Sequence, residues 1–267
     1  MKNKIGFIGA GKMAQAMMEG MVKSQTISKE NIMASTKTEE TKNIVEQKYE
    51  IVTSLNNSDV AEFADILILA VKPDLYAAVI EEIREHIKYS TIVVTIAAGI
   101  TLKDIENSFG FRVKAVRTMP NTPSVVGEGM SVICANDELS EAEVVQVEKI
   151  FQTFSKTERL DEKLMDAVPA ISGSSPAYVY MLIEAMADGG VRQGIPRDQS
   201  YRLAAQAVLG SAKMVLETGK HPGELKDNVC TPGGATIEAV VTLEEKQFRG
   251  SIMAAMDSCT SKVKNLL

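Results

Sequence analysis

Short β-branched runs alternate with amphipathic segments up to about residue 160, and this alternation constrains the fold more than any other feature of the sequence. Alternating strands and helices are typical of a parallel sheet covered by helices on both faces. Residues 66–71, Ile-Leu-Ile-Leu-Ala-Val, show no polar alternation, so this strand is expected in the middle of the sheet with both faces covered. Strands are predicted over residues 5–8, 31–35, 66–71, 91–96, 113–118, 130–135 and 157–160, with helices over 12–24, 38–47, 73–86, 102–109 and 141–154.

The second part of the chain has a different residue composition. After about residue 163 the β-branched runs disappear, and alanine, methionine, leucine and glutamate dominate. The helices that we predict here are apolar on more than one face, which indicates a subunit interface. The sequence therefore predicts two domains, an α/β domain over residues 1–162 and an all-helical domain over 163–267. Glycine and proline separate predicted helices at 174–193, 197–218, 222–229, 233–243 and 245–267.

Charge and cysteine content exclude several classes of protein. The net charge of −6 is the opposite of what a nucleic-acid-binding surface needs, so no nucleic acid is expected as a partner. Uncharged stretches are far shorter than the roughly 20 residues that cross a bilayer, and no membrane association is expected. Three cysteines without C-x-x-C spacing fit a reducing compartment, which predicts a cytoplasmic protein. Lys12 and Glu19 interrupt the apolar run that would otherwise resemble a signal peptide.

A glycine-rich turn follows the first predicted strand. Gly9-Ala10-Gly11-Lys12-Met13-Ala14 has the G-x-G-x-x-A pattern and opens a helix. In such turns the first glycine permits the tight turn, the second lets the backbone approach a pyrophosphate, and the helix N-terminus favours negative charge. A plain strand-to-helix connection can have the same pattern, but its place after the first strand favours dinucleotide binding.

The end of the second predicted strand bears on the choice of coenzyme. An NAD site usually places an acidic residue here to bind the ribose 2′-hydroxyl. This chain has Ser35, Thr36 and Lys37 instead, and two hydroxyls with an ammonium group can hold a 2′-phosphate. NADPH is therefore the expected coenzyme, with NADH possible but weaker. The alternative is that Ser35 and Thr36 are ordinary turn residues and Lys37 is a solvated surface charge.

Further strand ends point to the same crevice, and two helix starts in the helical part are candidate binding sites. Ligands in open α/β sheets lie beyond the carboxyl ends of the strands, where this sequence places small residues and a rigid, proline-containing loop. In the helical part, residues 172–178 and 230–236 each begin a helix. The N–H groups at the second start can bind a small carboxylate, or the Ser and Thr residues can act simply as caps. The strand-end residues are Ala70, Val71, Lys72, Pro73, Ala97 and Ala98, followed by the loop of residues 117–123.

Histidines and metal-binding patterns are scarce. His86 lies near the end of a polar helix and His221 in a turn, so neither is an obvious acid–base residue. The sequence contains no H-E-x-x-H motif, no Cys/His cluster and no EF-hand loop, and no metal is expected. Hydride transfer needs none of these, because the coenzyme carries the chemistry.

Several ordered motifs in this chain are typical of one family. They are residues 6–13, 70–73, 119–123, 172–178, 187–191, 225–227 and 232–237. Through them the chain resembles, over essentially its whole length, the pyrroline-5-carboxylate reductases, which catalyse the last step of proline biosynthesis. Ser175 differs from the family pattern, which usually reads Ser-Gly-Ser-Gly-Pro there; if the position needs a positive φ or close approach of a ligand, Ser175 could weaken activity.

The resemblance implies a Rossmann-like domain followed by an all-helical dimerisation domain, an obligate homodimer or ring of dimers, and a Gly-Gly-Ala-Thr loop supplied by the partner subunit. It also implies that the substrate is a cyclic imine with one carboxylate. Thr236 would be the catalytic residue, hydrogen-bonded to the ring nitrogen. Substrate-binding roles are implied for Asn121, Ser174, Pro176, Gly233, Gly234 and Ala235. Coenzyme-binding roles are implied for Ile8, Gly9, Ala10, Gly11, Lys12, Met13, Ser35, Thr36, Lys37, Asn57, Ala70, Val71, Lys72, Pro73, Ala97 and Ala98.

Two alternative functions remain open from the sequence. β-Hydroxyacid dehydrogenases also join a G-x-G-x-x-G/A domain to a helical domain, but their catalytic lysine lies in the first long helix, and residues 176–188 contain no lysine here. A regulatory protein that binds nucleotide with little turnover is the second alternative, and Ser175 is the residue that keeps it open.

Overall fold

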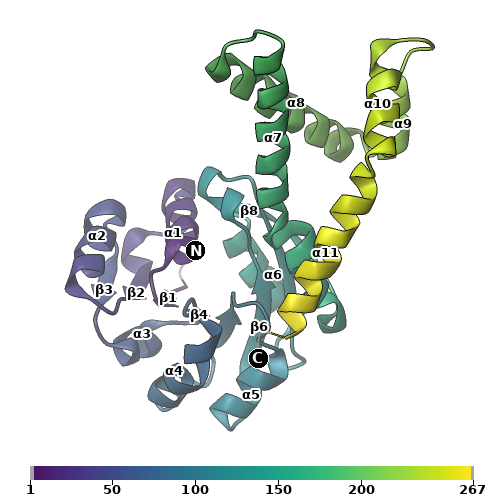
Figure 1. The fold of residues 1–267 in the computed structure, drawn as a ribbon. Helices are drawn as coiled ribbons and strands as arrows, with labels where there is room; N and C mark the ends of the chain where they lie inside the picture. The colour runs from purple at the N-terminus through teal and green to yellow at the C-terminus, as the bar shows by residue number, and fades with distance from the viewer. Residues whose placement is uncertain (1–2, 266–267) are drawn as a thin grey trace. The chain divides into compact units, whose positions relative to one another are not determined.

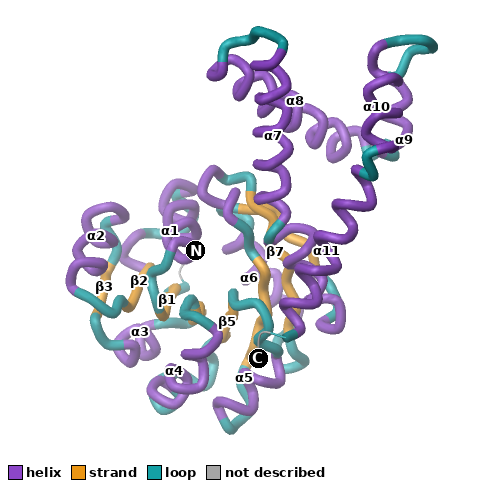
Figure 2. Tube along the Cα trace, in the orientation of Figure 1, coloured by secondary structure: helices purple, strands orange, loops and turns teal. Residues whose placement is uncertain are grey.

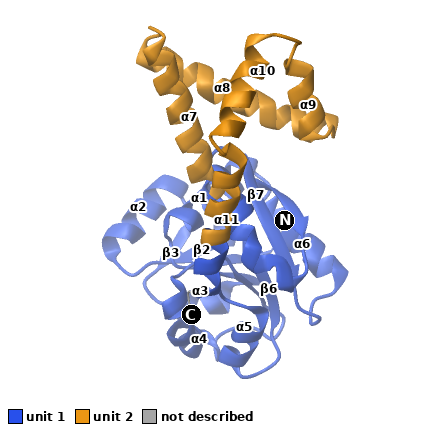
Figure 3. Cartoon of the chain, turned by 45° about the vertical axis from the view of Figure 1, so that its right-hand side comes forward, with its two compact units in different colours: residues 1–174, 259–267 blue, residues 175–258 orange. Residues whose placement is uncertain are grey.

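The computed structural model describes residues 3–265, and its internal contacts divide the chain into two units (Figure 3). The first unit runs to Ser174 and takes in the described end of the chain from Cys259, whereas the second unit spans Ser175–Ser258. Composition placed the boundary near residue 162. Residues 162–174 belong to the first unit because Met165 and Val168 are buried against Met119 and Val132 of its sheet.

The first unit is built on an eight-stranded sheet with the order β3-β2-β1-β4-β5-β6-β7-β8 (Figure 1). The order reverses direction between β1 and β4, which places a crevice at their carboxyl ends, as in other doubly wound folds. The strands are β1 (Ile5–Ile8), β2 (Ile32–Ser35), β3 (Val52–Ser54), β4 (Ile66–Leu69), β5 (Ile92–Thr95), β6 (Lys114–Met119), β7 (Gly129–Ala135) and β8 (Ser155–Arg159).

Helices cover both faces of this sheet. Buried side chains of α1, α2 and α6 form one core with alternate residues of the central strands, and those of α3, α4 and α5 form the other. On β4, Ile66 and Ile68 face the first core while Leu67 and Leu69 face the second, which confirms the expectation that both faces of this strand are covered. The helices are α1 (Lys12–Ser24), α2 (Glu39–Tyr49), α3 (Asn57–Phe63), α4 (Tyr76–Ile83), α5 (Leu102–Phe109) and α6 (Glu141–Phe151).

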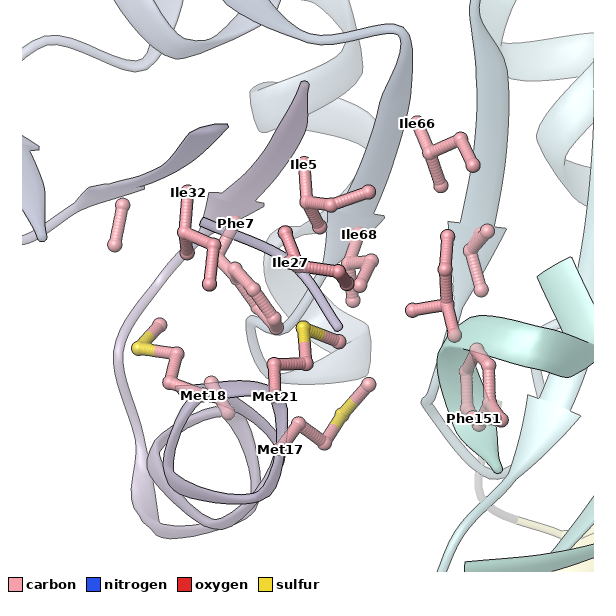
Figure 4. Packing of buried hydrophobic residues seen from close by; sticks show 14 of the residues in the cluster. Ile5, Phe7, Met17, Met18, Met21, Ile27, Ile32, Ile66, Ile68 and Phe151 are labelled. Atoms are coloured by element: carbon pink, nitrogen blue, oxygen red, sulfur yellow. The ribbon is translucent and has the colours of Figure 1, made fainter. Parts of the chain in front are cut away.

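The methionines of α1 show how closely the first core is packed. Met17, Met18 and Met21 point from one face of the helix toward Phe7 and the isoleucines of the central strands (Figure 4). All three are fully buried. Unbranched methionine side chains fill irregular gaps between a helix and a twisted sheet, and here they fix α1, and with it the turn before α1, against β1.

Two features of the sheet differ from the sequence-based expectation. β7 pairs antiparallel with β6, so β7 and β8 run against the other strands. The connection between β6 and β7 is a short loop with one 3₁₀ turn, η3 (Thr122–Val126), and parallel pairing would need a longer crossover. The sequence analysis also missed β3 and α3. β3 has three residues at the sheet edge and α3 has seven, too few for a hydrophobic period to be recognised.

The second unit consists entirely of helices in the structure, as expected (Figure 2). The first two pack through small residues, since Ala187 of α7 and Ser200 and Ala204 of α8 are buried. Many large apolar side chains are exposed, among them Met181, Leu203 and Leu216. Such a surface is expected where another subunit covers it. The helices are α7 (Ser175–Arg192), α8 (Arg197–Thr218), α9 (Pro222–Val229), α10 (Ala235–Glu245) and α11 (Phe248–Lys264), whose last residues belong to the first unit.

Within residues 3–265, none of the helices combines the length and apolar character needed to cross a membrane.

Candidate functional site

The turn between β1 and α1 has the geometry of a phosphate-binding turn. Gly9 has a left-handed φ of +94°, and a Cβ there would lie 3.0 Å from the carbonyl oxygen of Ala70, so the turn needs glycine for both reasons. A Cβ added at Gly11 would have no atom within 4 Å, so this position leaves open space above the backbone. Gly11 is the N-cap of α1 and supplies no side-chain cap. The first N–H groups of α1 therefore remain available to an anion.

The end of β2 is arranged differently from what the sequence indicated. Ser35 is buried, and its hydroxyl accepts from the Gly9 N–H over 3.2 Å while donating to Asn57 Oδ1 over 2.7 Å. Thr36 is also buried and donates its hydroxyl hydrogen to the Thr38 carbonyl. Of the three residues expected at a 2′-phosphate, Lys37 alone has an exposed side chain. Ser35 is thus part of the support beneath the glycine turn.

Asn57 at the start of α3 links this support to α4. Its Oδ1 accepts from Ser35, and its Nδ2 donates to Glu82 Oε2 over 2.8 Å. The carboxamide is therefore oriented by hydrogen bonds at both ends. Its position beside Ser35 keeps it at the predicted adenosine end of the crevice, on the side of the sheet where β2 ends.

A cleft opens beside the glycine turn, at the carboxyl ends of β1, β4 and β5. The sequence placed most of these residues in the coenzyme site, and the structure brings them together in one hollow. Met13, Ala70 and Val71 are partly buried, whereas Lys12 and Lys72 are exposed. The full lining consists of Gly11, Lys12, Met13, Ala14, Ala70, Val71, Lys72, Pro73, Ile96, Ala97, Ala98 and Pro120.

The loop after β6 places Asn121 in a supporting role. Its carboxamide donates to the Ser172 carbonyl over 2.9 Å and accepts from the Met130 N–H over 2.8 Å. Both hydrogen bonds go to backbone groups, and the residue is buried. Asn121, predicted as a substrate-binding residue, thus fastens the segment before α7 to the start of β7.

Arg117 on β6 is a residue that the sequence analysis did not single out. Its guanidinium is 2% exposed and lies 2.5 Å from Asp166 and 3.6 Å from Glu162. Arg117 lies two residues before Met119, and Asn121 lies two residues after it. Together these two side chains hold residues 162–173 against the sheet. An arginine in the middle of a strand predicted to lie within the sheet was the signal that could have revealed this role.

Ser174 and Ser175 lie where the first unit leads into α7. Cys259 Sγ donates to Ser174 Oγ over 3.4 Å, so α11 contacts this segment within the first unit. Ser175 is the first residue of α7. Among the described residues other than glycine, a left-handed φ occurs at Gln25, Glu50 and Gln247, and Ser175 is not one of them. The position therefore does not require glycine for its backbone, which removes a positive φ as a reason to suspect impaired activity at Ser175.

The remaining candidate residues belong to the second unit. Pro176 lies in the first turn of α7. Gly233 has a left-handed φ of +68°, and Gly234 is the N-cap of α10 without a side-chain cap. Ala235 and Thr236 are the first two residues of that helix. The N-terminal N–H groups of α10 and the Thr236 hydroxyl are thus presented together at one helix end, an arrangement suited to a carboxylate.

A wider hollow lies between α5, β7 and the end of β8. Arg159 forms ion pairs with Glu141 and Glu148. Burial, reinforced by the nearby Glu162 carboxylate, raises the pKa of the Cys134 thiol in this hollow, which keeps it protonated and unreactive. Within residues 3–265 no group of His, Cys, Asp and Glu side chains is placed to hold a metal ion.

Two family models match the chain. "Pyrroline-5-carboxylate reductase dimerisation" matches residues 162–266, which include all of the second unit. "NADP oxidoreductase coenzyme F420-dependent" matches residues 4–99, which hold the glycine turn and the ends of β2, β4 and β5. The two matches fall on the two parts of the chain that differ in residue composition, the α/β part and the helical part.

Relatives match the chain from end to end. The pyrroline-5-carboxylate reductase of Escherichia coli is 44% identical over 266 residues, which are 100% of this chain and 99% of that protein. That of Methanosarcina acetivorans is 41% identical over 98% of this chain and 97% of its own length. The crystal structure of Plasmodium falciparum pyrroline carboxylate reductase with NADP bound superposes with a TM-score of 0.90 at 32% identity, covering 99% of this chain and 98% of that one.

Proposed function

The chain belongs to the pyrroline-5-carboxylate reductase family, and on that premise we propose that it reduces 1-pyrroline-5-carboxylate to L-proline with NADPH, the last step of proline biosynthesis. The observation that carries the proposal is the match over the whole chain at 44% identity. The first unit, whose main segment ends at Ser174, binds the coenzyme. The second unit, Ser175–Ser258, forms the subunit interface and binds the substrate.

The cleft at the carboxyl ends of β1, β4 and β5 fits a dinucleotide. Gly11 leaves open space over the turn, and α1 begins with uncapped N–H groups, which supports placing the pyrophosphate there. Lys12 and Lys72 flank the cleft with positive charge. The small residues Ala70, Ala97 and Ala98 line the nicotinamide side. When bound, the coenzyme supplies a hydride, and the protein positions the acceptor carbon of the substrate.

NADPH is the preferred coenzyme, with NADH used more weakly. No carboxylate side chain occupies the end of β2, where an NAD site would have one, and the exposed Lys37 offers a partner for the 2′-phosphate. The NADP bound to the Plasmodium falciparum relative supports the same choice. Asn57 contributes at the adenosine end, whereas Ser35 and Thr36 contribute by supporting the backbone.

The substrate is a cyclic imine that is protonated on its ring nitrogen. Hydride adds to the imine carbon, the C=N double bond becomes a single bond, and the nitrogen remains as a secondary amine. The hydroxyl of Thr236 hydrogen-bonds this nitrogen and orients the ring, while the N–H groups at Gly234, Ala235 and Thr236 hold the carboxylate. Gly233 permits the turn before α10. Asn121, Ser174 and Pro176 shape the substrate end, and for Asn121 the role is indirect, through Ser172.

The chain assembles with copies of itself through the helical part. Its match to a dimerisation domain and the exposed apolar side chains of the second unit, such as Met181 and Leu203, both support a homo-oligomer. The assembly is a homodimer or a ring of dimers in which the partner subunit supplies the loop before α10. A monomer would then be inactive. The three free cysteines suit the reducing cytoplasm.

The test is loss of NADPH absorbance with purified protein and 1-pyrroline-5-carboxylate, with proline identified as the product and the assay repeated with NADH. Turnover that prefers NADPH would support the reaction and the coenzyme. Binding of NADPH without formation of proline would overturn the proposed reaction and leave the coenzyme site in place. Equal dissociation constants for NADPH and NADH would overturn the coenzyme preference alone.

A further inference from the structure

Tyr76, in the first turn of α4, lies behind the coenzyme cleft and does not line it. The residue is 3% exposed and packs in the core formed by α3, α4 and α5. Its hydroxyl lies 2.7 Å from the carbonyl oxygen of Leu69 and 2.7 Å from Thr95 Oγ1. Leu69 is the last residue of β4, Thr95 is the last residue of β5, and the two are partners in the strand register. One buried hydroxyl thus joins the carboxyl ends of two neighbouring strands.

The direction of the hydrogen bonds follows from the groups at the two ends. The backbone N–H of Ala97 can only donate, and it donates to Thr95 Oγ1 over 3.2 Å. The carbonyl of Leu69 can only accept, so it receives the Tyr76 hydrogen. Thr95 must then donate its hydrogen to the Tyr76 oxygen, which gives a chain running one way from Ala97 to Leu69. Burial raises the pKa of the Tyr76 phenol far above its usual range, so the hydroxyl keeps the hydrogen that this chain requires.

Both ends of the hydrogen-bond chain lie next to residues of the cleft. The peptide between Leu69 and Ala70 is held on its two sides, because Ala70 N–H donates to the Ile8 carbonyl over 2.9 Å while Tyr76 holds the Leu69 carbonyl. Ala70 and Ala97 both line the cleft. Because the spacing of these two backbone segments sets the width of the cleft on this side, a group that joins them controls that width.

We propose that Tyr76 is a positioning residue that sets the spacing of Ala70 and Ala97 on the nicotinamide side of the coenzyme cleft. The inference rests on the proposed function, which places NADPH in this cleft with its nicotinamide beside these residues. Tyr76 does not touch the coenzyme. It acts through the backbone of the strand ends, which form the wall against which the nicotinamide ribose is held.

The test compares Tyr76→Phe with the full-length wild type. The ring and its packing remain, while the hydroxyl and its hydrogen bond to the Leu69 carbonyl are lost. The NADPH dissociation constant should rise about 3- to 10-fold, the scale of one buried hydrogen bond, and kcat should fall. The dissociation constant of 2′,5′-ADP, which carries only the adenosine half of NADPH, should not change. A general loss of structure would instead weaken the binding of both ligands.

Thr95→Val provides a second variant in case Tyr76→Phe folds poorly. It removes the middle hydroxyl of the chain and should reproduce the selective loss of NADPH affinity, while Thr95→Ser should restore wild-type binding. Thr91→Val is the matched control, because Thr91 is also a buried threonine next to β5 but lies at the entry of the strand, where its hydroxyl donates to Ala64.

If NADPH affinity and kcat were unchanged in Tyr76→Phe, this inference would be overturned. It would also be overturned if NADPH and 2′,5′-ADP bound equally more weakly. Neither result would affect the activity of the wild type. If the wild type bound no NADPH, the proposed function would fall, and this inference with it.

Discussion

The hydroxyl of Ser35, at the end of β2, accepts a hydrogen bond from the backbone N–H of Gly9 in the β1–α1 turn over 3.2 Å. The same hydroxyl donates to Asn57 at the start of α3. The residue expected to bind the 2′-phosphate is therefore committed to holding the turn on which the pyrophosphate would rest. Ser35, at the adenosine end of the proposed coenzyme site, thus supports the backbone of the turn proposed for the pyrophosphate.

Replacement of Ser35 by alanine separates these two roles. Ser35→Ala leaves the Gly9 N–H without its partner, so the turn loosens and NADPH and NADH should both bind about 3- to 10-fold more weakly. The measurement is a fluorescence titration with each coenzyme. Ser54→Ala, at the equivalent end of neighbouring β3, where the hydroxyl donates to Asp59, is the control. Weakening confined to NADPH would instead show that Ser35 contacts the 2′-phosphate.

Lys37 should show the opposite pattern. Its ammonium group is exposed beside the end of β2 and would attract a phosphate without supporting the fold. Lys37→Gln should weaken NADPH binding by roughly 3- to 10-fold at low salt and by less at high salt, and should leave NADH binding unchanged. Lys42→Gln on α2, whose lysine pairs with Glu39, is the matched control. An unchanged ratio of the two dissociation constants would remove Lys37 from coenzyme selection.

Several parts of the fold could be predicted from the sequence because they depend on local pattern. The uninterrupted apolar run of β4 indicated that both of its faces are covered, and the glycine spacing indicated the turn before α1. The structure contains both features. The antiparallel β7 was missed, although the short connection of residues 120–128 is a readable sign of it. β3 and α3 are too short to show a period.

The supporting roles of Tyr76, Asn121 and Ser35 could not be predicted from the sequence. Tyr76 occupies an ordinary apolar position of α4, and its hydrogen-bond partners are identified by the pairing of β4 with β5. Ser35 was predicted as a ligand contact because hydroxyls at the end of β2 can hold a 2′-phosphate, and Asn121 because the family resemblance implies a substrate-binding role. In the structure their polar atoms bond to backbone groups and to Asn57, which depends on contacts between distant parts of the chain.

The pairing of Glu143 with Lys114 predicts a pH-dependent contribution to stability. Glu143, in the first turn of α6, closes a capping box with Ser140 and hydrogen-bonds the ammonium group of Lys114 on β6. The Lys114 ammonium, aided by Ser140, holds the pKa of the Glu143 carboxyl below its usual range. Because the pKa is lowered in the folded state, the stabilisation is present above the unfolded-state pKa of about 4.3 and is lost as pH falls through the folded-state value.

Glu143→Gln keeps the capping geometry but removes the charge, so it should lower the free energy of unfolding by about 0.5–1 kcal/mol at pH 7. The difference from wild type should disappear in acid, as pH falls through the lowered pKa of Glu143 in the folded state. Urea unfolding across this pH range measures both values, with Glu158→Gln, an exposed carboxyl on β8, as the control. A difference that persisted unchanged into acid would mean that the charge on Glu143 does not contribute.

Thr236, the second residue of α10, tests the chemistry of the substrate site most directly. Removal of its hydroxyl takes away the proposed hydrogen bond to the ring nitrogen, so Thr236→Ala should lower kcat by a factor of about 10 to 100, or about 1–3 kcal/mol. NADPH affinity should not change, and Thr236→Ser should retain most of the rate. Thr242→Ala is the control, because this threonine lies on the same helix and donates to the Glu238 carbonyl. If Thr236→Ala turned over at the wild-type rate, positioning of the imine would have to come from the N–H groups of α10 alone.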